Sequence, residues 1–474
     1  MKNLKNLLKI TTLFLVVVVA FSCSDDDDVK MPVGDQNIVE IALATPELTV
    51  LVQALTAADG DLVNVLQGDG PFTVLAPTNS AFVAFLNANG FGSLDDVPTD
   101  VLSQILLNHV IMADVTSSDL TSLGSGYASG SATSDVGLPI SIYFDASNGV
   151  RFNNTASVST ADIDASNGTI HIIDAVIGLP DIVDHAIANP AFSSLVTALG
   201  AADGNLVNVL QGDGPFTVLA PDNDAFATFL DGAPLGGVDT AVLSQILLNH
   251  VLGAAINAEF LTNAGAGYTI SSATGAGGNA MSIYYNTSDG VKFNGISSVT
   301  NADIVGTNGI IHAVDTVIDI PTVVTFAAAD PNFSTLVTAL TDLTPNTDFV
   351  SILSRTEVGS PVDGINPNFT VFAPTNDAFA ALESIPGETV LTQVLLHHVI
   401  SEANITSSDL NNPGDTTGTT LEGDDITITL PGTGNNIANI TDGSGATDIG
   451  IVAVDVQAGN GVIHVINKVM IPNL

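Results

Sequence analysis

The sequence predicts an α+β protein that consists of three tandem copies of one domain. The strand-like stretch Phe72–Pro77 returns unchanged at Phe216–Pro221 and with one substitution at Phe369–Pro374. In each copy a helix start follows the strand, and each third of the chain closes with a second strand that carries a histidine. The copies lie roughly 150 residues apart, which is the size of an independent domain and too long for a solenoid repeat.

The chain begins with a leader of the secretory type. Three lysines precede an apolar run over residues 11–21, which is long enough for a signal peptide and too short to span a bilayer. Cys23 follows almost at once, and the arrangement resembles a bacterial lipoprotein signal, in which the cysteine becomes the lipidated first residue. We predict a signal peptide at 1–22 and lipidation at Cys23. The alternative is an ordinary secretory peptide with an incidental cysteine.

An acidic tether over residues 23–35 comes next. Asp25–Asp28 are four consecutive carboxylates, which cannot pack and are typical of a solvated, extended segment. An acidic run directly after a lipidated cysteine is similar to the surface-export signals of Bacteroidetes lipoproteins, although a plain spacer would look much the same. The expected localisation is the outer membrane, lipid-anchored and facing the cell exterior. Cys23 is the only cysteine, so no disulfide can form within the chain.

Composition limits the partners. The 474 residues are 46% hydrophobic and 12% charged, which is enough apolar material for several cores. Fifty acidic residues face eight basic ones, giving a formal net charge of −42. This charge repels phosphate backbones and argues against nucleic acid as a partner, while it favours solubility and divalent cations.

Each repeated strand is expected to turn a sharp corner into a helix. Threonine and valine alternate with phenylalanine and leucine, and the proline then ends the strand. The next residue, Thr78, Asp222 or Thr375, is a good N-cap for the helix that follows. The third copy has a longer segment before its strand, over residues 354–368, and we expect an extra surface loop there.

Two further motifs complete each copy. A helical stretch brings a histidine onto its buried stripe, and a closing Asn-Gly strand carries a second histidine. Between them, Asn148-Gly149 and Asp289-Gly290 separate apolar runs and predict hairpins. The paired motif histidines of the three copies are His109 and His171, His250 and His312, and His398 and His464. The expected domains are 36–180, 181–321 and 322–474, with short linkers near Pro180 and Pro321 that favour a semi-rigid rod.

The three motifs in this order resemble the fasciclin-like domain. The shared features are a Thr-Val-x-Ala-Pro stretch, a Leu-Leu-x-His-Val helix and an Asn-Gly-x-Ile-His strand, each present three times. The resemblance implies two small β-sheets in a wedge flanked by helices, and secreted or surface-anchored modules of adhesion and matrix contact without enzyme activity. Animal members are described with a Tyr-His pair that contacts integrins. Here Asn108, Asn249 or His397 precedes the histidine, so integrin binding is not supported.

The motif histidines could either have a structural role in the core or form a reactive site. No His-x-x-x-His or cysteine pair supplies further metal ligands, and no Gly-x-Ser-x-Gly elbow lies between a strand and a helix. The favoured interpretation is structural, with each ring bonded to the backbone. No cofactor, catalytic residue or metal ligand is expected. Weak calcium binding stays open at Asp59–Asp61 and Asp203–Asn205, which supply oxygens in short turns but no EF-hand loop.

The sequence therefore predicts a non-catalytic, lipid-anchored adhesion or matrix-interaction protein. Its expected partners are surface proteins or polysaccharides of the matrix or of neighbouring cells, with the membrane reached through the lipid anchor. Two alternatives remain: a structural or scaffolding lipoprotein of the envelope, and a hydrolase that acts on a surface polymer.

Overall fold

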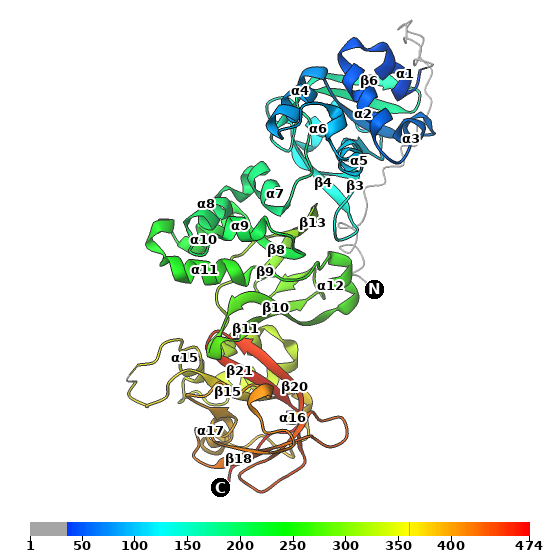
Figure 1. Cartoon of the computed structure of the whole chain (residues 1–474). Coiled ribbons are helices and arrows are strands. Elements are labelled where there is room, and N and C mark those ends of the chain that lie inside the picture. The colour runs from blue at the N-terminus through cyan, green and yellow to red at the C-terminus, as the bar shows by residue number, and fades with distance from the viewer. Residues whose placement is uncertain (1–35, 360) are drawn as a thin grey trace, which may run out of the picture.

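The structure is a computed structural model, and it describes residues 36–359 and 361–474. Three α+β domains follow one another along an elongated molecule, coloured blue to cyan, green, and yellow to red in Figure 1. The predicted fold class and the threefold repetition are confirmed. The predicted signal peptide 1–22, Cys23 and the tether 23–35 lie outside the described residues.

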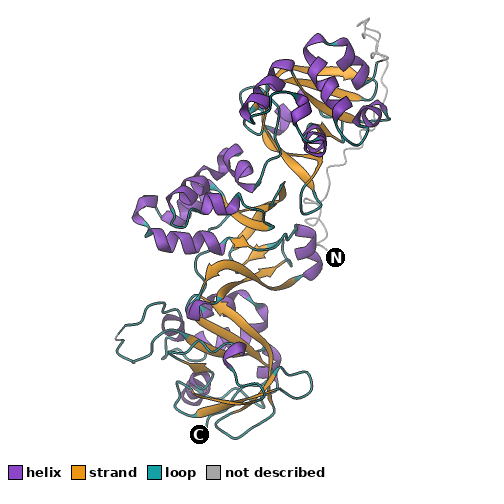
Figure 2. Ribbon diagram, in the orientation of Figure 1, coloured by secondary structure: helices purple, strands orange, loops and turns teal. Residues whose placement is uncertain are grey.

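In the first domain, strands β1 to β7 pair in sequence order and close into a barrel, and helices cover one side (Figure 2). β1 runs parallel to β7, and the other neighbours are antiparallel. The two expected small sheets meet edge to edge through short β2–β3 and β5–β6 pairings. The elements are α1 (Ile38–Ala44), α2 (Thr49–Ala57), α3 (Leu62–Gln67), β1 (Phe72–Pro77), α4 (Asn79–Ala88), α5 (Thr99–Leu107), β2 (Val110–Ile111), α6 (Ser117–Leu123), β3 (Ser125–Thr133), β4 (Pro139–Asp145), β5 (Arg151–Phe152), β6 (Ala156–Ala165) and β7 (Gly168–Ile173).

The second domain repeats this order, and its strands β8 to β14 also close into a barrel. The hairpins predicted at Asn148-Gly149 and Asp289-Gly290 connect β4 to β5 and β11 to β12. The elements are α7 (Ile182–Ala188), α8 (Ser193–Ala201), α9 (Leu206–Leu210), β8 (Phe216–Pro221), α10 (Asn223–Leu230), α11 (Thr240–Asn249), β9 (Val251–Leu252), α12 (Ala258–Ala264), β10 (Ala266–Thr274), β11 (Ala280–Asn286), β12 (Lys292–Phe293), β13 (Ser297–Gly306) and β14 (Gly309–Val314).

The third domain keeps the strand order but forms an open seven-stranded sheet, β16-β15-β21-β20-β19-β18-β17. Residues 354–359 and 361–368 form no helix or strand, as expected for the longer segment. The elements are α13 (Val323–Ala329), α14 (Ser334–Thr341), α15 (Phe349–Leu353), β15 (Phe369–Pro374), α16 (Asn376–Ala380), α17 (Glu388–Leu396), β16 (Val399–Ile400), β17 (Gly414–Thr419), β18 (Asp425–Leu430), β19 (Ala438–Thr441), β20 (Ile449–Ala458) and β21 (Gly461–Ile466).

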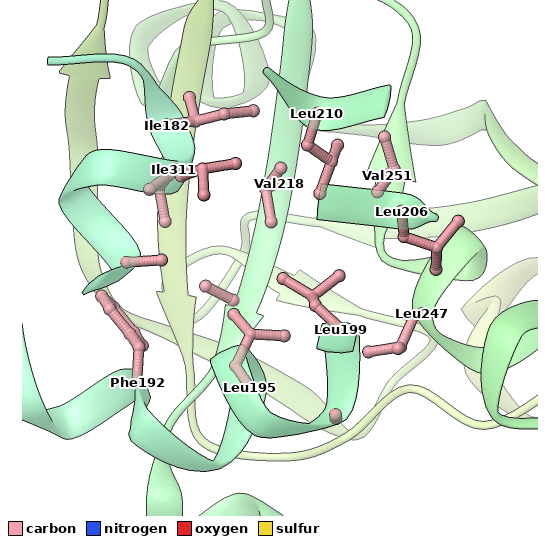
Figure 3. Close-up of a cluster of buried hydrophobic side chains, with 14 of the residues drawn as sticks. Ile182, Phe192, Leu195, Leu199, Leu206, Leu210, Val218, Leu247, Val251 and Ile311 are labelled. Carbon is pink, nitrogen blue, oxygen red and sulfur yellow. The ribbon is translucent and has the colours of Figure 1, made fainter. Parts of the chain in front are cut away.

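The repeated strand lies between two cores in every domain. In the second domain, Val218 and Ala220 point to the helices, whereas Leu219 points into the barrel, because successive side chains of a strand face opposite sides. Figure 3 shows the helix-side core of this domain, in which Val218 of the strand belongs to one cluster with Leu199 and Leu206 of the helices. Burial on both faces explains why this strand is almost continuously apolar.

The corner after the strand is capped as the sequence predicts. The side chains of Thr78, Asp222 and Thr375 each accept the backbone N–H three residues on, at 3.2, 2.8 and 3.2 Å. Each cap satisfies one orphan donor of its helix, so the strand, the proline and the cap fix the angle between sheet and helix.

Within residues 36–359 and 361–474, no single helix has the length and hydropathy needed to cross a membrane. The pair Ile38–Ala44 and Pro46–Ala57 reaches that length and hydropathy only when both are counted together, and the two segments meet at 104°.

Candidate functional site

The first motif histidine of each domain closes the end of a helix. His109 Nδ1 lies 2.7 Å from the carbonyl oxygen of Ile105, and its Nε2 lies 2.9 Å from the amide of Ile177. The Nδ1–H donates to an orphan carbonyl of the last helical turn, and Nε2 accepts an amide hydrogen. Because α5 ends at Leu107, His109 stands just beyond the helix and not on the stripe that the sequence indicated.

The other two domains repeat this bridge. Burial lowers the pKa of His109, His250 and His398 to about 4, which keeps the rings neutral at pH 7. The equivalent bonds join His250 to Ile246 O (2.8 Å) and Ile318 N (2.8 Å), and His398 to Val394 O (2.7 Å) and Met470 N (2.9 Å).

The second motif histidine uses the opposite tautomer. His171 Nε2–H donates to Val115 O at 2.9 Å, and Nδ1 accepts the Asp162 amide hydrogen at 3.2 Å. The equivalent bonds join His312 to Ile256 O (2.8 Å) and Asp303 N (3.3 Å), and His464 to Ile405 O (2.8 Å) and Asp455 N (3.5 Å). In all six motif histidines, both ring nitrogens are therefore engaged by the backbone, and neither member of a pair is free to act as a base or a ligand.

An aspartate that the sequence analysis missed supports the second histidine. Asp162, Asp303 and Asp455 sit at an irregularity of their strands with φ of 57°, 58° and 63°, a left-handed conformation that aspartate tolerates. Each also accepts the backbone N–H of a nearby segment, at 2.8 Å from Ser117, 2.9 Å from Ala258 and 2.7 Å from Ser407. The repeated Ala-Asp-Ile at 161–163 and 302–304 was the signal that could have revealed it.

The closing Asn167-Gly168 pair ties the first helix of its domain to the end of α3. Asn167 accepts the Ile38 amide at 3.0 Å and donates to the carbonyls of Leu66 and Gly68 at 2.8 and 2.9 Å. A Cβ at Gly168 would lie 1.9 Å from the carbonyl oxygen of Phe72. Glycine is needed here because the parallel strands β1 and β7 approach too closely for any side chain.

Among the described residues, one group of three metal-type ligands lies close together, His397, Glu422 and Asp424, with ligand atoms within 4.8 Å of one another. His397 Nε2 accepts the Gly443 N–H at 3.1 Å, so the ring proton sits on Nδ1 and faces Thr420 Oγ1 at 3.1 Å. A metal at Nδ1 would move that proton to Nε2, directly against the Gly443 N–H. The group does not fit a metal ion.

The two turns considered for calcium direct carboxylates to neighbouring helices. Asp59 Oδ2 accepts the Thr99 hydroxyl at 2.8 Å, and Asp203 Oδ2 accepts the Thr240 hydroxyl at 2.9 Å. These bonds anchor the starts of α5 and α11 and give the aspartates a structural role.

The junction between the first and second domains is built on two tyrosines. Tyr127 stacks at a tilt on Tyr143 with ring centroids 5.2 Å apart, and it meets His185 of α7 edge-on at 5.7 Å. Asn189 Nδ2 donates to the Tyr127 hydroxyl at 3.1 Å. The Val305 N–H donates to the Ser141 hydroxyl at 2.9 Å, so a side chain of the first domain also binds the backbone of the second.

The junction between the second and third domains repeats the pattern. Tyr268 packs on Tyr284 at 5.1 Å and meets Phe326 of α13 edge-on at 5.7 Å. Its hydroxyl donates to Asp330 Oδ2 at 3.0 Å. Ser282 accepts the Gln457 N–H at 3.0 Å, as Ser141 accepts that of Val305. The two junctions therefore hold successive domains in the same manner.

Fold and motifs define a tandem module protein in which the recurring polar residues hold the backbone together. The chain belongs to the fasciclin family, since the family model described as Fasciclin domain matches residues 46–180, 190–321 and 331–472.

Relatives from animals and bacteria share these domains. Transforming growth factor-beta-induced protein ig-h3 of Sus scrofa is 29% identical over 71% of this chain and 46% of its own length, and Periostin of Homo sapiens is 27% identical over 88% and 45%. The chain thus spans under half the length of these two proteins. An uncharacterized protein of Synechocystis is 41% identical over 30% of the chain and 96% of its own length. The FAS1 domain pair of the insect cell adhesion molecule Fasciclin I has a TM-score of 0.35 and 18% identity over 57% of the chain and 96% of its own.

Proposed function

We propose that this chain is a non-catalytic adhesion or matrix-contact protein, anchored by a lipid on Cys23 to the outer membrane and facing the cell exterior. Family membership supports the adhesive role, because fasciclin-like domains are mostly surface modules of that kind. The lysine-rich leader, the apolar run and the acidic tether after Cys23 support the anchor.

One observation carries the non-catalytic part of the proposal. The six motif histidines, which recur in every domain, have both ring nitrogens bonded to backbone groups. A general base or nucleophile partner must keep one nitrogen available to the reacting group. Their role is to hold the fold, and binding is left to the domain surfaces.

The tandem arrangement gives weak surfaces a combined strength. Three domains held in fixed order by two similar junctions present related faces along one rod. When several such faces meet one matrix polymer or one cell surface, each later contact forms at a high effective concentration. The partners proposed are therefore extended or repeated: polysaccharides, or arrays of surface proteins, of the matrix or of neighbouring cells. A net charge of −42 directs this preference to neutral or cationic partners.

Attachment of the host cell tests the proposal. Deletion of the gene is expected to reduce attachment to matrix or to neighbouring cells, and the wild-type chain is expected to restore it. The Cys23→Ser chain should appear in the medium and fail to restore attachment. If deletion leaves attachment unchanged, the adhesive role is wrong.

A pull-down from the native envelope identifies the partner class. Recovery of matrix polysaccharide or foreign surface protein supports adhesion. Recovery of the host's own outer-membrane proteins alone, with no external ligand, would instead favour the scaffolding role.

A further inference from the structure

The third domain contains an apolar cavity of about 280 Å³ within its helical layer. It lies between α13, α14 and α15 and reaches the repeated strand β15. The side chains that line it include Val324, Phe333, Val337, Leu340, Val350 and Leu353. Protein interiors seldom leave voids larger than a water molecule, so a cavity of this size calls for an occupant.

Water does not suit the cavity. Its lining is apolar apart from His398 and Thr341. Both nitrogens of His398 are bonded to backbone groups, and the Thr341 hydroxyl donates to Val337 O at 2.8 Å. A buried water needs two to four polar partners, and these two side chains have already made their bonds. The occupant must therefore be apolar where it lies inside.

The size of the cavity sets the size of the occupant. An apolar cavity of about 150 Å³ holds one benzene molecule, and ligand pockets begin near 300 Å³. By proportion, about 280 Å³ accommodates a hydrocarbon group of roughly ten carbon atoms.

The rim of the cavity restricts the polar end of such a molecule. Val350 is 41% exposed and Thr341 is exposed, so the cavity opens to solvent beside α14 and α15. Asp342 directly follows the lining residue Thr341, and Asp348 directly precedes the lining residue Phe349. No lysine or arginine lines the cavity. A carboxylate or phosphate head would be repelled here, whereas a neutral or cationic head would not.

The second domain differs at the corresponding leucine. Its Leu199 is buried and packs with Leu206 of α9 (Figure 3). In the third domain the corresponding Leu340 is only half-buried, and α15 is reached through the longer segment 342–348. The less buried Leu340 and the longer segment both adjoin the cavity.

We propose that the third domain binds one hydrocarbon chain or ring system of roughly ten carbons, with a neutral or cationic head, in this cavity. The site is independent of the proposed attachment role, because it lies in the interior of one domain and not on the domain surfaces.

Calorimetric titration of the purified protein with decan-1-ol tests the site. One saturable site per chain is expected, with decanoate at least tenfold weaker because of the acidic rim. Among alcohols of six to fourteen carbons, affinity is expected to stop rising near ten carbons. Affinity that keeps rising with chain length would mean surface adsorption and would overturn the proposal, as would the lack of saturable binding.

Two variants locate the site. Val350→Trp places a large ring at the mouth of the cavity and is expected to weaken decan-1-ol binding at least tenfold. Val207→Trp makes the matched change in α9 of the second domain and is expected to leave binding unchanged. Ala327→Leu fills the cavity from α13 and should abolish binding while the melting temperature is kept or raised. This second variant distinguishes loss of the cavity from unfolding, in case Val350→Trp does not fold. Wild-type affinity in both cavity variants would overturn the assignment.

Discussion

The two junctions of the tandem share their geometry and differ in their polar groups. At each, a tyrosine pair packs against the next domain's helix, and a serine hydroxyl accepts the next domain's amide. At the first junction the ring facing Tyr127 is His185, whereas at the second it is Phe326 that faces Tyr268. The shared geometry with different partners indicates that ring packing sets the arrangement of a junction, and we expect the polar partner to set its response to pH.

The equivalent positions on the outer faces of the first and third domains depart from this pattern. In the third domain the tyrosine pair is replaced by Asp415 and Thr429, which pair in the same register and share a hydrogen bond of 2.7 Å. In the first domain the position of Val305 is held by Asp164, which is exposed. The positions that form a junction elsewhere in the chain therefore carry an exposed aspartate in the first and third domains.

The largest effect is expected from Tyr268→Ala. The variant removes the ring that packs on Tyr284 and Phe326 and leaves Oδ2 of the buried Asp330 carboxylate without its donor, while Oδ1 keeps the Asn332 N–H. We expect a loss of about 4 kcal/mol in the coupling of the second and third domains, measured by calorimetric unfolding. Tyr127→Ala should cost less, because it leaves an amide unpaired and not a carboxylate. Equal losses of coupling free energy in the two variants would contradict the proposed difference between the junctions.

Acid is expected to weaken the first junction more than the second. Burial lowers the pKa of His185 from 6.5 to about 4, and its Nδ1 has no partner. The unfolded chain takes up a proton near pH 6.5 and the folded chain does not, so stability is lost as the pH falls from 6.5 towards 4, by about 3 kcal/mol. His185→Phe copies the second junction and should remove this part of the pH dependence.

Chemical unfolding at pH 7 and at pH 4 measures this difference. The motif histidines are the same in the wild type and in the variant, so their contribution to the pH dependence cancels in the comparison. Phe326→His is the reciprocal variant and should add acid sensitivity to the second junction. If the His185→Phe chain keeps the full pH dependence of stability, the pKa of His185 does not differ between the folded and the unfolded chain.

The smallest effect is expected at the two serines. Ser141→Ala and Ser282→Ala each remove the acceptor of one interdomain amide hydrogen bond, at 2.9 and 3.0 Å. Each should reduce the free energy of coupling by about 1 kcal/mol, and the two losses should be alike. Hydrogen exchange at the Val305 and Gln457 amides reports the change. Protection that survives at either amide would mean that the serine is not its partner.

The local elements were predictable because their signals are local. The strand, the proline and the cap at Thr78 lie within seven consecutive residues, and their geometry follows from backbone chemistry alone. The threefold repetition then identified the domain. The histidine motifs were visible for the same reason, although the end of α5 before His109 was not.

The junctions and the cavity could not be predicted in this way. Ser141 and Val305 are 164 positions apart and meet only because the domains stack. Asp162 depends on an irregular strand whose position no single-residue preference reveals. The cavity depends on the separation of α15 and α14. That separation is set by side-chain packing and cannot be derived from the sequence pattern.

The double variant His171→Ala, His312→Ala measures the central claim most directly, that the motif histidines build the fold and leave no reactive centre. Each substitution leaves buried backbone groups unpaired and should cost about 2 to 4 kcal/mol, so the melting temperature should fall. Attachment per folded molecule, assayed well below that temperature, should equal that of the wild type. An unchanged melting temperature with lost attachment, or with a lost hydrolytic activity, would contradict the account.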